Sequence, residues 1–540
     1  MSAKTNRQAH EAHTQRAKRV ATQVKSFYDR KEPFRIFHGS TSSTRSQEQD
    51  RKKMISTSDF TEILRIDPEK RVAIVEPNVS MEKLVDATLP YGLIAPVIME
   101  FKNITVGGGF SGTSGESSSF RHGVFDNIVN SIEIVLGNGE IVRASRSENS
   151  DLYHGAAGSF GTLGVVTELE IQLVEAGNFM ELEYHAVSSA PEAVRAIETY
   201  TADNKIQYLD GIMFSKTSGL IIAGRMVNTP TAGCKITKYL SRADPWFYVR
   251  AQEILNSEIP FSKGRSYTEV VPLKDYLFRF DRGAFWGGYY AFKYHFAPFN
   301  KLTRYLLDDL IHTKTMYTAL HKSGLANEFI VQDIGFPYST TPGFIDYLDE
   351  SFNLYPLWLC PLKLNAPYPL SPKGKHYSQD TLRVINIGVW GPGPRNRSDF
   401  IAANRAIEAK TKALDGLKCL YAHAYYTSSE FWDLYDKQHY DALRHKYHAT
   451  LLPSVFDKVT NNGPPEKNSL FERLKNIRPV RGIYGALFVF WGGGLPYANV
   501  HKVLSIVLSP LLLLIFTTAW VVSFGKDLFG LRPKRKVHVE

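Results

Sequence analysis

Cysteine is scarce in this sequence of 540 residues. The three cysteines, Cys234, Cys360 and Cys419, lie far apart and form no CxxC pair. This spacing excludes a disulfide framework and a zinc site built on paired cysteines, so we expect no bound metal. It is typical of a protein in a reducing, cytosol-facing compartment.

Targeting and nucleic-acid signals are also missing. Residues 1–24 are polar and basic, without the apolar run that a cleavable signal peptide requires. The net charge of +10 is accompanied by no helix-turn-helix, zinc-finger or RNA-recognition signature, and the positive residues gather toward the two ends of the chain. We therefore expect no nucleic acid as a partner, and a negatively charged membrane surface explains the charge distribution better.

The common phosphate-binding fingerprints are absent as well. The sequence contains neither a GxxxxGK[ST] loop nor a GxGxxG turn followed by the acidic residue of a dinucleotide-binding unit. This excludes a P-loop nucleotide hydrolase and a simple Rossmann domain.

A long apolar run is present near the C-terminus. Residues 503–525 carry no charge over 23 positions, whereas about 20 apolar residues suffice to cross a bilayer. A second apolar stretch at 483–500 allows either a single span or a membrane hairpin. The basic tail at 526–540 favours the hairpin slightly, because a hairpin keeps both the body and the tail on the cytosolic side.

The remainder has the composition of a globular protein, with 43% hydrophobic and 22% charged residues. It is too long for one core, which usually stops growing near about 300 residues. We expect six consecutive parts. They are a basic amphipathic segment (1–30), a first folded domain (31–175), a second folded domain (176–459), a linker (460–482), one or two membrane segments (483–525) and a basic tail (526–540).

Local patterns predict mixed secondary structure in the first folded domain. Apolar residues recur at near-helical intervals over residues 9–28 and 79–91. Gly137-Asn138-Gly139 between two β-rich runs predicts a hairpin. A small-residue turn from Gly161 leads into a further strand.

Two glycine-rich segments are the best candidates for a binding site. Backbone N–H groups of such segments can surround an anion, and glycine lets the backbone approach phosphate oxygens closely. The first segment comprises Thr105, Val106, Gly107, Gly108, Gly109, Phe110, Ser111, Gly112, Thr113, Ser114, Gly115, Glu116 and Ser117. The second provides Gly158, Ser159, Gly161, Thr162, Gly164 and Val165.

The paired segments resemble the FAD-binding domain of the vanillyl-alcohol oxidase type. The resemblance implies an α+β fold, with a two-subdomain FAD-binding domain (31–175), a mixed α/β substrate or cap domain (176–459) and the C-terminal transmembrane segment. It also implies that residues 38–44 form a first turn over the pyrophosphate. Because His38 precedes its glycine instead of following a glycine pair, we expect the FAD to be non-covalent.

A closer resemblance, over about residues 71–458, is to the delta-24 sterol reductase (24-dehydrocholesterol reductase/Diminuto) family. The matching pieces occur in order as VEPNVSM, TVGGGFSGTSGESSS, SENSDLYHG, YPLWLCP and KCLYAHAYYTSSEFWDLYD. The resemblance implies reduction of a sterol side-chain double bond with FAD and NADPH, at the endoplasmic reticulum or another internal membrane. The partners are then a sterol and a lipid bilayer, with a homo-oligomer left open. The sequence departs from animal members, which carry their membrane segment at the N-terminus.

The implied chemistry requires an acid and a dry pocket, because an isolated alkene accepts hydride only after protonation. Asp333, Glu430 and Tyr425 are the candidate acids, and each also has a structural interpretation. Aromatic faces would stabilise the resulting cation. The candidates, most of them expected in the core, are Phe278, Phe280, Phe285, Trp286, Tyr289, Tyr290, Tyr421, Tyr425, Tyr426, Phe431 and Trp432.

Two alternative functions remain open from the sequence. One is a flavin oxidase of a soluble alcohol, sugar or lactone, which leaves the apolar C-terminal run unexplained. The other is a non-catalytic, FAD-bound sterol-binding or scaffold protein. The fold does not decide among the three, because function depends on the site.

Overall fold

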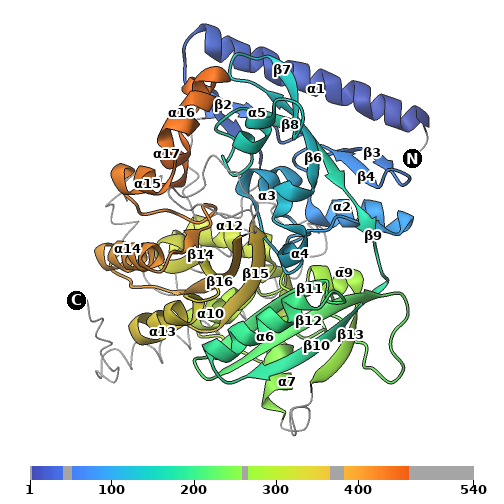
Figure 1. The fold of residues 1–540 in the computed structure, drawn as a ribbon, viewed down its shortest axis with the longest axis vertical. Coiled ribbons are helices and arrows are strands. Elements are labelled where there is room, and N and C mark those ends of the chain that lie inside the picture. The colour runs from blue at the N-terminus through green and yellow to red at the C-terminus, as the bar shows by residue number, and fades with distance from the viewer. Residues whose placement is uncertain (1–2, 40–50, 258–265, 365–381, 461–540) are drawn as a thin grey trace, which may run out of the picture.

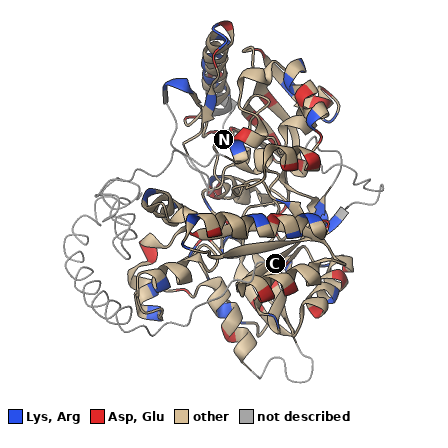
Figure 2. Ribbon diagram, turned by 90° about the vertical axis from the view of Figure 1, so that its left-hand side faces the viewer, with Lys and Arg blue, Asp and Glu red and all other residues tan. Residues whose placement is uncertain are grey.

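The computed structural model describes residues 3–39, 51–257, 266–364 and 382–460 (Figure 1). Two antiparallel sheets organise these residues, the smaller in the upper part of Figure 1 and the larger in the lower part. Acidic and basic residues are interspersed along the ribbon of both parts (Figure 2).

The smaller sheet has five strands in the order β3-β4-β8-β6-β7. Their bounds are Ile63–Asp67 for β3, Val72–Val75 for β4, Val129–Val135 for β6, Ile141–Ser145 for β7 and Val165–Gln172 for β8. The predicted hairpin is confirmed, since β6 and β7 pair antiparallel around Gly139, which has a left-handed φ of 88°. The strand predicted after Gly161 is confirmed as β8.

The larger sheet has eight strands in the order β13-β10-β12-β11-β15-β16-β14-β17. Their bounds are Phe179–Val187 for β10, Tyr208–Ser215 for β11, Ser218–Val227 for β12, Tyr267–Pro272 for β13, Phe329–Pro337 for β14, Leu357–Leu364 for β15, Leu382–Pro392 for β16 and Leu417–Lys418 for β17. All its neighbouring strands are antiparallel.

The two faces of this larger sheet belong to different cores. Leu357 and Leu359 pack into a core with apolar residues of α6 (Ala190–Ala202), α13 (Thr341–Phe352) and α14 (Arg397–Ala413). Trp358 and Cys360 point the other way, into the core that also contains the smaller sheet. This follows from the alternation of side chains along a strand. The face that carries Trp358 and Cys360 therefore lies on the side of the glycine-rich segments.

Shorter elements connect the sheets and cover their edges. The remaining helices are α2 (Met81–Thr88), α3 (Val106–Gly112), α4 (Ser119–His122), α5 (Ser150–Ala156), α7 (Phe247–Asn256), α9 (Leu273–Leu277), α10 (Gly287–Tyr294), α11 (Lys301–Leu306), α12 (Thr313–Ser323), α15 (Ser428–Leu434), α16 (Lys437–Lys446) and α17 (Val455–Val459). Two small sheets pair β1 (Arg35–Phe37) with β2 (Met54–Ser56), and β5 (Leu93–Ile94) with β9 (Val174–Glu175). Helix α2 confirms the helix predicted over residues 79–91.

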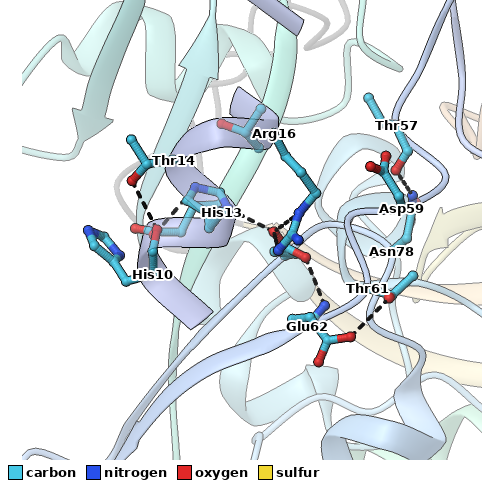
Figure 3. Close-up of polar contacts among 12 residues, drawn as sticks. His10, His13, Thr14, Arg16, Thr57, Asp59, Thr61, Glu62 and Asn78 are labelled. Atoms are coloured by element: carbon cyan, nitrogen blue, oxygen red, sulfur yellow. Dashed lines mark hydrogen bonds and ion pairs between the residues drawn. The ribbon is translucent and has the colours of Figure 1, made fainter. Parts of the chain in front are cut away.

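The predicted N-terminal amphipathic helix is confirmed as α1 (Ala3–Asp29), which packs on the smaller sheet through buried Ala17, Val20 and Val24. Its buried His13 bonds through Nδ1 to Glu76 at 2.8 Å and through Nε2 to Glu133 at 3.2 Å. Figure 3 shows this histidine turned from the helix toward the body, beside Arg16. Burial lowers the pKa of His13, but the bonds to Glu133 and Glu76 outweigh it and raise the pKa to about 9. The helix is thus attached by buried charge as well as by apolar contact.

The predicted fold class is wrong in its transmembrane component. Residues 503–525, like the stretch at 483–500 and the basic tail, lie outside the described residues, and no described helix is both long and apolar enough to cross a membrane. Helix α1 has the length, with 27 residues, but Arg7, Glu11 and Lys18 are exposed on it. A spanning helix must be predominantly apolar. The corrected fold class is α+β with two antiparallel sheets.

Candidate active site

The first glycine-rich segment folds into a short helix, α3, instead of an open loop. The Thr105 hydroxyl caps its start by accepting from the Gly108 N–H at 3.1 Å. A Cβ at Gly107 would lie 2.7 Å from the Pro77 Cβ. Glycine at position 107 therefore allows α3 to pack closely against the segment that contains Pro77.

The structure brings the two glycine-rich segments together. The Phe160 N–H donates to the Ser111 carbonyl at 3.1 Å, and a Cβ at Gly158 would lie 3.2 Å from the Thr113 Cγ2. Gly161 lies against Ile36 of β1, where the predicted first turn begins. That turn, at residues 38–44, is described only as far as Gly39. The described parts of all three predicted segments are thus adjacent.

The donors at this junction fit an anionic dinucleotide such as FAD. The backbone has left-handed φ values at Thr113, Gly158, Phe160 and Gly161, and such turns form N–H concavities that bind anions. The buried Ser118 hydroxyl, within the described residues, has no hydrogen-bond partner. The side chains of Val106, Phe110 and Val165 are buried in the core, so only their backbone is available to a ligand. The assignment of FAD contacts to individual residues stays a prediction.

A pair of carboxyl groups lies where the glycine-rich segment meets the larger sheet. Buried Glu116 accepts from the Ser117 hydroxyl at 2.7 Å and lies close enough to Glu100 for its charge to affect the Glu100 pKa. Burial, with the neighbouring Glu116 charge, raises the pKa of Glu100 well above its usual range. Burial also raises the pKa of Glu116, although the Arg279 charge opposes this shift. The pair therefore tends to hold a proton.

Arg279 is buried beside these carboxyl groups, on the segment between α9 and α10. Its guanidinium donates to Asp210 of β11 at 2.7 Å and lies 4.0 Å from the centroid of the Tyr276 ring. The Trp358 indole N–H donates to the same Asp210 at 3.1 Å. Both partners are almost fully excluded from water, so removal of one would leave an uncompensated buried charge.

Asp333 of β14 lies on the same face of the larger sheet. Asn386 Nδ2 donates to its Oδ1 at 2.7 Å, the Tyr421 hydroxyl donates to its Oδ2, and the Trp390 side chain is a further hydrogen-bond partner. Burial raises the pKa of Asp333 to about 6, although all three hydrogen bonds act in the opposite direction. Tyr317 is also close enough for the Asp333 charge to affect its pKa. This carboxyl group therefore titrates near neutral pH.

An aromatic wall adjoins Asp333. Trp390 is 5.9 Å from Trp358 and 4.3 Å from Phe285 between ring centroids, and Phe285 is 3.9 Å from Phe280. A Cβ at Gly388 would lie 2.5 Å from the Trp390 ring, so only glycine at position 388 lets this indole lie across the strand. The wall provides several π faces beside one titratable acid.

The other two candidate acids lie elsewhere. Glu430 is half-exposed, caps the start of α15 by accepting from the Thr427 N–H at 2.7 Å, and pairs with Arg405 at 2.8 Å. Its capping bond to Thr427, together with Arg405, lowers its pKa. Tyr425 packs against the helix-covered core of the larger sheet, and burial raises its pKa to about 12. Of the three candidates, Asp333 alone is placed with the aromatic wall and the glutamate pair.

Several site residues escaped sequence reasoning. Four of these residues lie in apolar strands, namely Asn386, Trp390, Trp358 and Asp210. The sequence marks only Asn386 and Asp210, each as a single polar residue within an apolar run, VINIGVW and YLDGIMF. A related signal, a carboxylate beside aliphatic residues, did identify Asp333 in FIVQDIGFP. Glu100 had no such signal, because it precedes a loop and approaches Glu116 only through the fold.

Comparison with known proteins agrees with this geometry. An FAD binding domain model matches residues 12–145. The delta(24)-sterol reductase of Homo sapiens is 29% identical over 408 residues, covering 74% of this chain and 76% of the relative. The delta(24)-sterol reductase of Arabidopsis thaliana is 30% identical over 449 residues, covering 76% and 77%. This chain belongs to the delta(24)-sterol reductase family. A cytokinin dehydrogenase of Oryza sativa is 31% identical over 137 residues, which is 25% of this chain.

Three of the five segments that carried the family resemblance contribute residues to the site. TVGGGFSGTSGESSS forms α3 and contains Glu116, YPLWLCP contains Trp358, and KCLYAHAYY contains Tyr421. In this member of the delta(24)-sterol reductase family, the segment of α3 and the two segments of the larger sheet, at β15 and after β17, converge around Asp333 and the glutamate pair. The FAD-binding match ends at residue 145, before the second glycine-rich segment.

Proposed function

We propose that this chain reduces the delta-24 carbon–carbon double bond in the side chain of a sterol, using FAD and NADPH. Membership of the delta(24)-sterol reductase family and the FAD binding domain match support the reaction class. The observation that carries the assignment of an active site is Asp333, a buried carboxyl group with a pKa of about 6 beside the aromatic wall.

Asp333 is the group that supplies the proton. At pH 7 a carboxyl group with a pKa of about 6 is protonated in roughly one molecule in ten, against about one in a thousand for an ordinary aspartate. Transfer of this proton to the less substituted alkene carbon forms a C–H bond and leaves a tertiary cation on the other carbon. The three hydrogen bonds to Asp333 then hold the carboxylate that remains.

The aromatic wall stabilises the cation and excludes water. A cation over an aromatic face gains about 0.5 to 2 kcal/mol per ring, with tryptophan the best partner. Trp390 and Trp358 both belong to the wall next to the acid. Because water would capture the cation, the burial of these rings also determines the product.

The glycine-rich segments are the residues that would hold FAD. When bound, FAD supplies the hydride that completes the reduction, and NADPH is the proposed source of that hydride. One alkene, one NADPH and one proton then give the saturated side chain and NADP⁺. The glutamate pair, next to the glycine-rich segment, carries one negative charge instead of two when it holds a proton.

A sterol substrate also suggests the location. Since sterols partition into bilayers, we propose a lipid bilayer as a partner and the endoplasmic reticulum or another internal membrane as the compartment, with the catalytic domains facing the cytosol.

The test is anaerobic reduction of the flavin in the purified full-length protein. NADPH should bleach the flavin absorbance, and a sterol with a delta-24 double bond should restore it, whereas the saturated sterol should not. Restoration by oxygen alone would point to an oxidase of another substrate. A flavin that NADPH cannot reduce would contradict the proposal and favour a binding protein.

A further inference from the structure

Large hydrophobic side chains are exposed in one short region. In the described part of the chain eight such side chains are exposed, and five of them lie within residues 289–306. These five are Tyr289, Phe296, Leu302, Tyr305 and Leu306, with Leu302 66% and Leu306 52% exposed. We call them the 289–306 patch. Clustering of this kind is uncommon on soluble surfaces and marks interaction sites.

The patch is built on α10, α11 and the residues that join them. Leu302, Tyr305 and Leu306 have the i, i+3, i+4 spacing that places side chains on one face of a helix. Tyr289 of α10 lies 5.2 Å from Phe299 between ring centroids, and Phe299 in turn lies 4.8 Å below the Arg304 guanidinium of α11. An apolar helix face normally packs inward, but here it points to the surface.

Within the segment that forms the patch the charged side chains are all basic, and Glu253 of α7, which is close enough to affect Arg304, is paired with Arg250 at 4.0 Å. Residues 289–306 contain Lys293, Lys301 and Arg304 and no acidic residue. The two aspartates that follow are already paired, Asp308 with Arg282 at 2.8 Å and Asp309 with Arg242 at 2.7 Å. Apolar and aromatic side chains interspersed with basic ones, with the neighbouring acidic groups already paired, match the interface of a bilayer that carries anionic lipids.

The patch is connected to the candidate active site by the same helix. Trp286, immediately before α10, donates its indole N–H to the Trp390 carbonyl at 2.9 Å. Trp390 in turn is a hydrogen-bond partner of Asp333. One end of α10 therefore adjoins the proton donor, and Tyr289 within the helix belongs to the exposed patch.

We propose that the 289–306 patch is a docking surface for a bilayer containing anionic lipid, through which the substrate domain meets the membrane. A second copy of this chain is a poorer occupant, since a two-fold contact would oppose Lys301 and Arg304 to their own copies. The basic tail at 526–540 would be repelled in the same way. Docking at this surface would bring α10 to the membrane in which an apolar substrate is dissolved. Only this role in substrate access rests on the proposed function.

The test places a photoreactive benzophenone side chain at position 306 in the full-length protein, with vesicles of phosphatidylcholine and phosphatidylserine. The matched control carries it at position 141, where Ile141 is exposed at the start of β7. Lipid adducts should form at 306 and not at 141. Adducts confined to protein at 306, or lipid adducts that are equal at both positions, would overturn the proposal.

Charge reversal tests the lipid specificity in the same assay. Lys293→Glu with Lys301→Glu should raise the lipid concentration for half-maximal adduct at 306 by about tenfold or more, since each basic residue at an anionic surface contributes about a factor of five. The control pair, Lys70→Glu with Lys412→Glu, replaces two exposed lysines outside the patch and should leave this lipid concentration unchanged. Equal effects of the two pairs, or no dependence on phosphatidylserine, would refute an anionic docking surface. Neither assay requires flavin or sterol turnover, so this failure is distinct from failure of the proposed function.

Discussion

Removal of the Asn386 amide should move the pH dependence of sterol reduction upward. Asn386 Nδ2 donates to Asp333 Oδ1 at 2.7 Å and so favours the charged carboxylate. A hydrogen bond to a charged group contributes about 1.5 to 3 kcal/mol, or about 1 to 2 pKa units at 1.36 kcal/mol per unit. The pKa of Asp333, about 6 in the native protein, should therefore rise to about 7 to 8 in Asn386→Ala.

The direction follows from the role of the acid. A proton donor is active when protonated, so kcat/KM is constant well below pH 6 and falls about tenfold per pH unit above it. At pH 8 the native protein should retain about 1% of its acid plateau, and Asn386→Ala about 10 to 50% of its own. The measurement is kcat/KM for NADPH-dependent sterol reduction between pH 5 and pH 9.

A buried amide on the opposite face of the sheet provides the control. Gln332 on β14 is 1% exposed and donates to Asn404 at 2.8 Å, within the helix-covered side. Gln332→Ala should destabilise the protein comparably and leave the midpoint near pH 6. If the midpoint of the kcat/KM pH profile does not move in Asn386→Ala, the reasoning is refuted. It is also refuted if Asp333→Asn keeps the same fall of kcat/KM with rising pH, because the proton would then come from another group such as Glu100.

Three further outcomes test the buried charges. His13→Gln should lower the free energy of unfolding by about 3 kcal/mol below pH 6.5. The reason is that the pKa of His13 is raised to about 9 in the folded state, so its protonation stabilises the fold below the unfolded pKa, and this stabilisation is lost as the pH rises through 9. Thermal melts at pH 6 and pH 9.5 should differ in the native protein and much less in the variant. Asp210→Ala should cost about 3 to 5 kcal/mol in urea unfolding because it leaves the Arg279 charge buried and unpaired, and a normal stability would contradict that pairing. Glu430→Gln should cost no more than about 1 kcal/mol and leave kcat unchanged, since this residue is a half-exposed helix cap; a large loss of kcat would return it to the list of candidate acids.

The sequence determined the features that depend on local pattern. The hairpin at Gly137–Gly139, helix α1 and strand β8 follow from alternation, helical periodicity and turn residues, which act over a few neighbouring positions. The family was recognisable because five short segments occur in order. Asp333 was identifiable because an acid within an apolar strand requires an explanation.

The tertiary structure alone decided which residues share the site. Glu100, Glu116, Asp333 and Trp390 come from distant parts of the chain, and no local pattern predicts that two loops and two strands will bring them together. The fold likewise turned the first glycine-rich segment into a helix, because its glycines pack against Pro77 and neighbouring residues. It also separated Asp333 from Glu430, although both lie beside aromatic or aliphatic residues in the sequence. Burial sets the pKa of Asp333, and burial is a property of the assembled sheets that no stretch of sequence carries.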